Sequence, residues 1–321
     1  MSTCSTPRAP ASFRSIMDEI QRKMVGQAIT VRHTLAAFLA SGHVLLEDVP
    51  GTGKTTLAAS LATVVGLQFR RVQGTPDLLP SELVGTMVYN PATTQFTFRP
   101  GPIFTHVLVM DEINRATPRT QSALLEAMAE SQVSVDGHTH ALDGPFFVIA
   151  TANPIESQGV FPLPEAQLDR FMVRLKLGYT SEEDEIEMVR RVQLHEQPIL
   201  NRVVSSEQLL AIRQGLHTVR VQHDVLQYIT RLARASREHE QVLLGASPRS
   251  IVSLTSFSQA LALLSDREYV TPDDVQEAWI PVMNHRIHAR LEWDTGDEVL
   301  KLLQEILASV TAPSEFCEES S

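Results

Sequence analysis

The sequence is poor in cysteine and has no long apolar run. Only Cys4 and Cys317 occur in 321 residues, and both lie in polar terminal segments, so they provide neither a disulfide framework nor a metal cluster. No apolar stretch approaches the ~18 residues that indicate a membrane-spanning helix, and residues 1–13 lack the apolar centre of a signal peptide. We therefore expect a cytoplasmic protein.

The sequence also has fewer positively than negatively charged residues. The 27 Lys and Arg residues stand against 38 Asp and Glu residues, which gives a formal net charge of −11. This balance opposes a broad surface that neutralises phosphates, although it is compatible with a local basic groove. Nucleic acid is therefore disfavoured as the main partner. The 43% of hydrophobic residues can bury a sizeable core in one large domain or two unequal ones.

Hydrophobic periodicity predicts an α/β domain in the first part of the chain. Residues 1–12 and 312–321 lack periodic apolar positions, which predicts two flexible tails. Short apolar runs that alternate with helical stretches such as residues 54–65 and 119–131 predict a mainly parallel sheet covered by helices over residues 13–180. The strands are expected at residues 43–47, 68–72, 107–110, 146–150 and 171–175.

The strand signal disappears from about residue 181. Thr271, Pro272 and the acidic residues after them predict one helix start, because Thr can cap a helix and Pro fits its first position. A smaller all-helical domain is therefore expected at residues 181–311. Its helices are expected at residues 182–195, 205–216, 224–237, 249–264 and 272–290.

A glycine-rich turn follows the first predicted strand. It contains Gly51, Gly53, Lys54 and Thr55. Backbone N–H groups at such a strand-to-helix turn can bind a polyphosphate, with Lys54 at the β- and γ-phosphates and the Thr55 hydroxyl on Mg²⁺. The usual phosphate-binding loop motif has another glycine five residues before Gly53, where this sequence has Asp48. A plain turn with an exposed lysine is therefore the alternative.

Two further predicted strands end in polar residues. Residues 107–110 lead into Asp111 and Glu112, the position at which phosphoryl-transfer enzymes place a metal-binding Asp. Asp111 would hold Mg²⁺, and Glu112 could accept a proton from an attacking water, whereas two acids capping the next helix are the alternative. Asn153 follows the strand at residues 146–150 and could orient that water, although Asn-Pro alone is a turn signal.

These motifs resemble those of AAA+ ATPases and, within them, of the MoxR family, from residue 13 to about residue 307. The resemblance rests on VGQ at 25–27, LLEDVPGTGKT at 45–55, TPDLLPS at 75–81, DEINRA at 111–116, QSALLEAM at 121–128, ANP at 152–154 and LPEAQLDRF at 163–171. Asp48 is ordinary in this family. The resemblance therefore implies a three-layer AAA+ P-loop domain followed by an AAA+ lid.

The resemblance also implies roles for single residues. It implies Lys54 and Thr55 as the Walker A pair, Asp111 and Glu112 as Walker B, Asn153 as sensor 1 and Arg249 as sensor 2. The other nucleotide-binding residues expected in the turn are Pro50, Gly51, Thr52, Gly53 and Thr56. Arg170 stands where related proteins carry the arginine finger that reaches the neighbouring subunit's γ-phosphate, and a surface Asp–Arg pair is its alternative. Val25 and Gln27 resemble the segment that lines the adenine pocket. Arg115 and Arg119 face either the adjacent subunit or solvent.

Two insertions resemble hairpins that lie near the central pore of AAA+ rings. Residues 85–100 match the helix-2 insertion, and residues 131–144 match the pre-sensor-1 insertion, where Asp136-Gly137 is a hairpin signal. The second contains no Lys or Arg and the first only Arg99, unlike a loop that follows DNA electrostatically.

The function implied by the resemblance is an ATP-dependent, chaperone-like remodeler that uses ATP and Mg²⁺. It implies a homo-oligomeric ring, expected to be a hexamer, with a protein client and a von Willebrand factor A-domain partner. The alternatives are a magnesium-chelatase-type ATPase subunit, a nucleic-acid-linked AAA+ motor and a nucleotide-gated scaffold. Residues 75–81 and 121–128 favour the MoxR family over the chelatase type.

Overall fold

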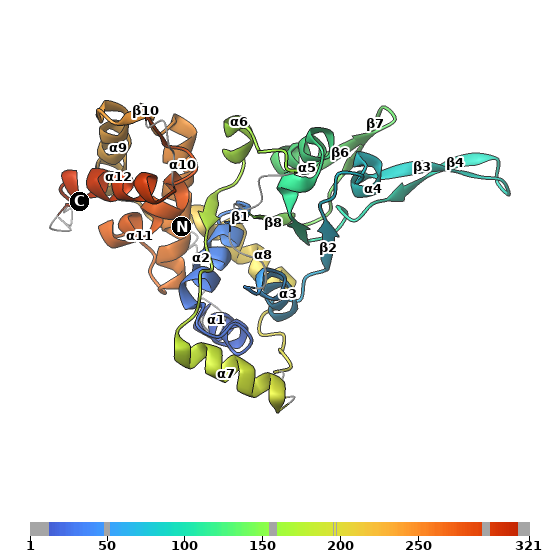
Figure 1. Ribbon diagram of the computed structural model, residues 1–321, viewed down its shortest axis with the longest axis horizontal. Helices are drawn as coiled ribbons and strands as arrows, with labels where there is room; N and C mark the ends of the chain where they lie inside the picture. Colours follow the sequence, from blue (N-terminus) through green and yellow to red (C-terminus); the bar gives the residue numbers. More distant parts are fainter. Residues whose placement is uncertain are drawn as a thin grey trace, which may run out of the picture.

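The computed structural model describes residues 13–47, 52–153, 159–194, 196, 198–290 and 296–313, which form a sheet domain and a helical domain (Figure 1). Five parallel strands form the central sheet in the order β2-β5-β8-β1-β9. Their bounds are β1 Val44–Glu47, β2 Phe69–Gln73, β5 Val107–Asp111, β8 Phe147–Ala152 and β9 Val173–Leu175. The predicted parallel sheet is confirmed, with each strand within two residues of its expected bounds.

The central strands divide their side chains between two cores, because successive residues of a strand point to opposite faces. Val107 and Val109 of β5 join one core, and Leu108 and Met110 join the other. The first core includes α1 Phe13–Gln21, α2 Ala28–Leu39 and α3 Lys54–Val64, and the second includes α4 Pro80–Val84 and α5 Pro118–Glu130. Apolar residues cover both faces of the sheet at its centre, which explains the apolar runs of β5 and β8, whereas β2 carries two exposed arginines.

The carboxyl ends of the parallel strands meet at one edge of the sheet. Gln73 at the end of β2 pairs with Asp111 at the end of β5, and Thr151 lies near the end of β8 on the other side of β5. β8 lies between β5 and β1, although it follows both in the chain. Ligands of open α/β sheets bind at this kind of edge, so polar side chains gathered there are candidates for chemistry.

Helices dominate the rest of the chain. They are α6 Glu165–Leu168, α7 Glu182–Gln193, α8 Ser206–Gly215, α9 His223–Glu238, α10 Pro248–Leu264, α11 Pro272–Met283 and α12 Gly296–Ser309. The Thr271 hydroxyl accepts a bond from the Asp274 N–H at the start of α11, which confirms the predicted cap. None of the described helices combines the length and apolarity needed to cross a membrane.

The helical region differs from the prediction at the end of α11. α11 ends at Met283 instead of continuing to residue 290, and His288–Ala289 form β11, which pairs antiparallel with β10 Val242–Leu244. In addition, α7 lies beside α1, where Arg191 Nη1 donates to the Arg22 carbonyl at 2.6 Å (Figure 1). α7 thus contacts the sheet domain, and the expected domain boundary at residues 180 and 181 stays a prediction.

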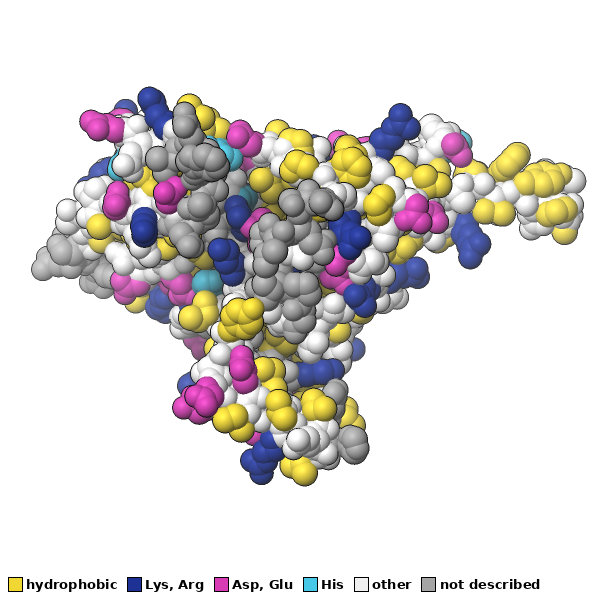
Figure 2. Space-filling model, viewed as in Figure 1, with side chains coloured by type: hydrophobic (Ala, Val, Ile, Leu, Met, Phe, Trp, Pro, Cys, Tyr) yellow, Lys and Arg dark blue, Asp and Glu magenta, His cyan; other side chains and the backbone are white. Residues whose placement is uncertain are grey.

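Both predicted hairpins are present. β3 Gly85–Asn90 and β4 Gln95–Pro100 form an arm that projects from the body, and β6 Gln132–Val135 and β7 His138–Ala141 form a shorter hairpin (Figure 1). Hydrophobic side chains gather at the end of the longer arm (Figure 2), where Val88, Tyr89 and Phe96 are 41%, 49% and 65% exposed. Exposed apolar side chains that are grouped in this way favour contact with another molecule.

Candidate functional site

α3 begins at Lys54, directly after a glycine in the left-handed region. Gly53 has a φ of 91°, a conformation that strains any residue with a Cβ, so the turn requires glycine. The first N–H groups of a helix have no partner within it, and the helix dipole favours negative charge there. This helix start is therefore suited to a phosphate. Residues 48–51, including Pro50 and Gly51, lie outside the described residues.

Asp111 lies at the centre of a polar cluster at the end of β5 and is 7% exposed. Its Oδ2 accepts from Thr55 Oγ1 at 3.3 Å and from Arg71 Nε at 2.5 Å. Its Oδ1 accepts from Thr151 Oγ1 at 3.3 Å. The structure thus brings together Thr55 and Asp111, the two residues predicted to hold the metal.

Thr55 and Asp111 offer the kind of donor that Mg²⁺ prefers. Mg²⁺ binds oxygens in an octahedron at 2.0–2.1 Å, so adjacent ligand oxygens lie roughly 3 Å apart. The 3.3 Å between Thr55 Oγ1 and Asp111 Oδ2 fits such a pair. Within the described parts of the chain, no group of three or more His, Cys, Asp or Glu side chains could hold a metal by itself. A nucleotide-bound Mg²⁺ takes its other ligands from phosphates and water.

Glu112 is fixed beside Asp111 by three hydrogen bonds. Its backbone N–H donates to Thr151 Oγ1 at 2.9 Å, and its Oε2 accepts from Gln73 Nε2 at 2.7 Å and from Arg115 Nη1 at 3.2 Å. The residue adopts φ 54°, which is uncommon for a residue other than glycine. Its side chain makes no capping bond to the short 3₁₀ helix η1 Ile113–Arg115, so the helix-cap alternative has no support here.

These polar groups surround a single hollow of about 350 Å³. It is lined by Gly53, Lys54, Thr55, Thr56, Arg71, Gln73, Asp111, Glu112, Thr151 and Asn153. Asn153 follows β8 directly, is 6% exposed, and its carbonyl accepts from Asn114 Nδ2 at 3.3 Å. The predicted lysine, metal ligands, base and water-orienting amide therefore lie around one space.

A second hollow, also of about 350 Å³, adjoins the first. Its lining residues are Lys23, Met24, Val25, Gln27, Thr52, Gly53, Thr56, Gly178, Tyr179, Thr180, Glu185 and Met188. Gly53 and Thr56 line both hollows. Val25 and Gln27 line this hollow. The apolar side chains of Met24, Tyr179 and Met188 beside them suit a planar base better than a phosphate.

Several residues of the site carry no signal in the sequence. Arg71 and Gln73 lie on β2, and only the strand order shows that β2 adjoins β5. Tyr179 and Met188 line the second hollow because residues 178–180 and α7 form one of its sides. The other sides come from residues 23–56, which are distant in the sequence. Thr151 directly follows the predicted strand at residues 146–150, and its polar side chain at that strand end is the one available signal.

Arg170 and Arg249 line neither hollow. Arg170 Nη1 donates to the Leu125 carbonyl on α5. Arg249 lies near the start of α10, where its Nε is 3.7 Å from Asp169 Oδ2 and its side chain is 61% exposed. The two arginines predicted as finger and sensor therefore both adjoin Asp169, separate from the hollow that contains Lys54. Arg115 binds Glu112 of its own chain, and Arg119 is exposed.

The sheet order, the helix start after Gly53 and the carboxylate pair at the end of β5 define an AAA+ domain with a helical lid. Residues 43–173 match the model of the ATPase family associated with various cellular activities (AAA), and residues 234–306 match the AAA lid domain.

The full-length relatives narrow this class further. The chain is 44% identical to the uncharacterised protein YeaC of Bacillus subtilis over 92% of this chain and 93% of that one. It is 39% identical to chaperone MoxR1 of Mycobacterium tuberculosis over 92% of this chain and 81% of that one. A solved candidate ATPase from Cytophaga hutchinsonii, 37% identical, matches with a TM-score of 0.85 over 94% of each chain. The chain belongs to the MoxR family of AAA+ ATPases.

Proposed function

We propose that the protein binds ATP with Mg²⁺ and hydrolyses it to ADP and phosphate in the hollow between Lys54 and Glu112. The observation that carries this proposal is the convergence of a lysine, two carboxylates and an amide around one hollow that continues into a more apolar one. The first hollow suits the triphosphate, and the second suits the adenine.

The residues of the site divide the chemistry among them. Lys54 and the N–H groups at the start of α3 bind the β- and γ-phosphates. Mg²⁺ held by Thr55 and Asp111 would neutralise charge on those phosphates. Glu112 accepts a proton from the water whose oxygen attacks the γ-phosphorus, while the bond to the bridging oxygen breaks and ADP leaves. Asn153 orients this water.

The test of this mechanism is Glu112→Gln. The amide keeps the shape of the side chain but cannot take the proton, so kcat should fall by about 10²–10⁴-fold while ATP binding persists. Steady-state hydrolysis and ATP titration measure the two quantities. Glu126→Gln is the matched control, because Glu126 is exposed on α5 away from the hollow, and its kcat should equal the parent's. Parent-like turnover by Glu112→Gln would overturn the assignment of the base.

We also infer a homo-oligomeric ring, expected to be a hexamer, in which Arg170 and Arg249 complete the site of the adjacent subunit. Both arginines lie outside the hollow of their own chain, and the exposed Arg249 is available to a neighbour. Arg170 Nη1 donates one hydrogen bond to the Leu125 carbonyl. A guanidinium has five N–H donors, so further donors of Arg170 remain for a phosphate. In other phosphoryl-transfer enzymes, an arginine finger that reaches the transferred phosphate raises kcat by about 10³–10⁵-fold.

Mixed rings test this arrangement. Arg170→Ala and Arg249→Ala subunits should each be inactive alone, because every site in such a ring lacks an arginine. Mixing either variant with Glu112→Gln should restore hydrolysis, since the intact hollow of one subunit then meets the intact arginines of the other. Mixed rings that form but stay inactive at every ratio would contradict action between subunits.

We propose that hydrolysis drives the assembly or activation of a partner protein complex in the cytoplasm, with a von Willebrand factor A-domain protein as partner. The name of the relative chaperone MoxR1 and the exposed apolar arm of β3 and β4 support this proposal. A purified A-domain protein should change the ATPase rate, whereas duplex DNA should not, given the net charge of −11. The opposite pattern of stimulation would favour a nucleic-acid motor.

A further inference from the structure

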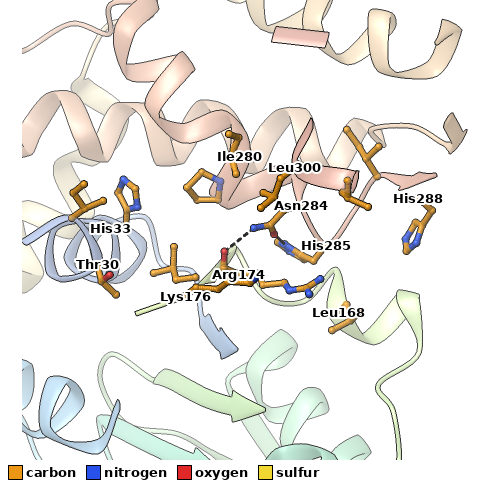
Figure 3. Close-up of a pocket in the computed structure, with 15 residues that line it drawn as sticks. Thr30, His33, Leu168, Arg174, Lys176, Ile280, Asn284, His285, His288 and Leu300 are labelled. Atoms are coloured by element: carbon orange, nitrogen blue, oxygen red, sulfur yellow. Dashed lines mark hydrogen bonds between the residues drawn. The ribbon is translucent and has the colours of Figure 1, made fainter. Parts of the chain in front are cut away.

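A short segment of the lid binds a run of backbone carbonyl groups in the sheet domain. The segment is Asn284, His285 and Arg286, which follows α11 directly. Asn284 Nδ2 donates to the Arg174 carbonyl at 3.0 Å, as Figure 3 shows. His285 Nε2 lies 3.0 Å from the Phe171 carbonyl, and since a carbonyl only accepts, this nitrogen carries the proton. Burial lowers the pKa of His285 well below its usual value, so the ring is neutral.

Arg286 is the most extensively bonded side chain of this segment, and it is 3% exposed. Its Nε donates to Asp169 Oδ1 at 2.7 Å. Nη1 donates to the carbonyls of Met172 and Val282 at 2.9 and 2.6 Å. Nη2 donates to those of Phe171 and Asp169 at 2.7 and 3.4 Å. These contacts account for all five N–H donors of a guanidinium, which fixes both its position and the carbonyls that it binds.

Asp169 joins this buried contact to the two arginines that lie outside the hollow. One of its carboxylate oxygens accepts from Arg286, and the other lies 3.7 Å from Arg249. Arg170 is the next residue in the chain. A single carboxylate of the sheet domain is therefore bound to two arginines of the lid, and it adjoins the arginine predicted to act as the finger.

We propose that Arg286 is a positioning residue for ATP hydrolysis in the adjacent subunit. By fixing residues 169–174 to the lid, it holds Arg170 of the sheet domain and Arg249 of the lid at a set distance from one another. The two arginines then reach the neighbouring γ-phosphate as one preformed pair, without a separate cost for aligning two domains. This inference rests on the proposed function and on the action of these arginines between subunits.

The place of Arg286 distinguishes this role from nucleotide binding in its own subunit. Neither Asn284, His285 nor Arg286 lines the hollow around Lys54 or the hollow beside it. Loss of Arg286 should therefore lower kcat and leave the KM for ATP unchanged. A shift of about 1 Å in a positioned group costs on the order of 10²-fold in rate, so we expect a fall in kcat of about 10–10²-fold.

The experiment compares Arg286→Gln with Arg267→Gln in the full chain. Arg267 makes a similar pair with Asp274, through two bonds of 2.6 Å, but both residues lie within the lid. Both variants should lower the melting temperature, and only Arg286→Gln should lower kcat. Mixing Arg286→Gln with Glu112→Gln should restore hydrolysis, because the first supplies an intact hollow and the second supplies correctly held arginines.

Two results would overturn the inference. One is a kcat for Arg286→Gln equal to that of the parent, and the other is an inactive Arg286→Gln that mixing fails to rescue while Arg249→Ala is rescued. If Arg286→Gln does not fold, Asn284→Ala removes one bond of the same contact and is judged by the same two criteria. Failure of the parent to hydrolyse ATP would instead refute the proposed hydrolysis. Failure of Arg249→Ala mixtures to recover would refute the proposed action between subunits, and the inference would fall in either case.

Discussion

Thr151 connects the two carboxylates that the proposed chemistry uses. Its hydroxyl donates to Asp111 Oδ1 and accepts from the Glu112 N–H, which a threonine hydroxyl can do at the same time. Thr151 is 3% exposed, so neither bond is readily replaced by water. The bond to Glu112 also helps to hold that residue at φ 54°. The position of the proposed base therefore depends on a hydroxyl outside the recognised motifs.

Thr151→Val tests this dependence. The substitution keeps the shape of the side chain but removes the hydroxyl partner of the Glu112 N–H and of Asp111 Oδ1, while Asp111 Oδ2 keeps its bonds from Thr55 and Arg71. We expect a loss of about 1–3 kcal/mol in the free energy of unfolding, because an unsatisfied buried group costs that much. We also expect kcat to fall on the order of 10-fold or more as Glu112 shifts. Urea denaturation and steady-state kinetics measure the two effects.

The control for Thr151→Val is Thr255→Val on α10. The Thr255 hydroxyl donates to the Ile251 carbonyl at 2.9 Å, a bond within one helix and away from the hollow. Its loss should change stability by about 0.5 kcal/mol at most and leave kcat unchanged. Equal kcat values for parent and Thr151→Val would mean that Glu112 is placed by Gln73 and Arg115 alone.

At the scale of elements, α2 of the sheet domain is bound to α11 of the lid through Glu277. The Glu277 carboxylate accepts from Arg32 Nε at 2.8 Å, and its Oε1 lies 3.1 Å from His33 Nε2. Burial alone would raise the pKa of Glu277, but the hydrogen bonds from His33 and Arg32 outweigh it and lower that pKa to about 2. The ionised carboxylate is therefore favoured in the folded chain.

The depressed pKa gives the contact between α2 and α11 a defined pH dependence. Glu277 stabilises the fold fully above its ordinary pKa of 4.5, and this contribution is lost as the pH falls from there toward 2. The difference in unfolding free energy between the parent and Glu277→Gln should shrink as the pH falls from 6 to 3, measured by urea denaturation. His43, whose pKa burial lowers to about 4, is present in both proteins, so its effect cancels. A constant difference would contradict the ion pair.

The elements that the sequence predicts correctly are those fixed by local pattern. Apolar runs set β5 and β8, and the cap at Thr271 sets the start of α11. The end of α11 depends instead on contacts of residues 284–286 with the distant residues 169–174, and the β10–β11 pair joins segments more than forty residues apart. Nothing local encodes such contacts, so helical periodicity alone predicts a helix that continues to residue 290.

The candidate site shows the same division. The sequence predicts the convergence of five residues, because each belongs to a motif that follows a strand. They are Lys54, Thr55, Asp111, Glu112 and Asn153, and in the structure they line one hollow. Arg71, Gln73, Tyr179 and Met188 reach the two hollows only through the strand order and the packing of α7, which the sequence does not reveal.

For the whole molecule, the hollow and the arginine pair lie in different places on one chain. Lys54 and Glu112 line the hollow, whereas Arg170 and Arg249 adjoin Asp169 and line neither hollow. On the proposed mechanism, a single subunit therefore holds ATP without the arginines that speed its hydrolysis. Activity should depend on assembly, because only a neighbour can supply the missing charges.

Steady-state ATP hydrolysis across a protein concentration series, for the parent and Lys54→Ala, tests both the site and its completion by a neighbouring subunit. Specific activity should rise with concentration as rings form, and Lys54→Ala should be inactive at every concentration. A specific activity that does not change with concentration would contradict a site completed by the adjacent subunit. Hydrolysis by Lys54→Ala at the parent rate would contradict the site itself.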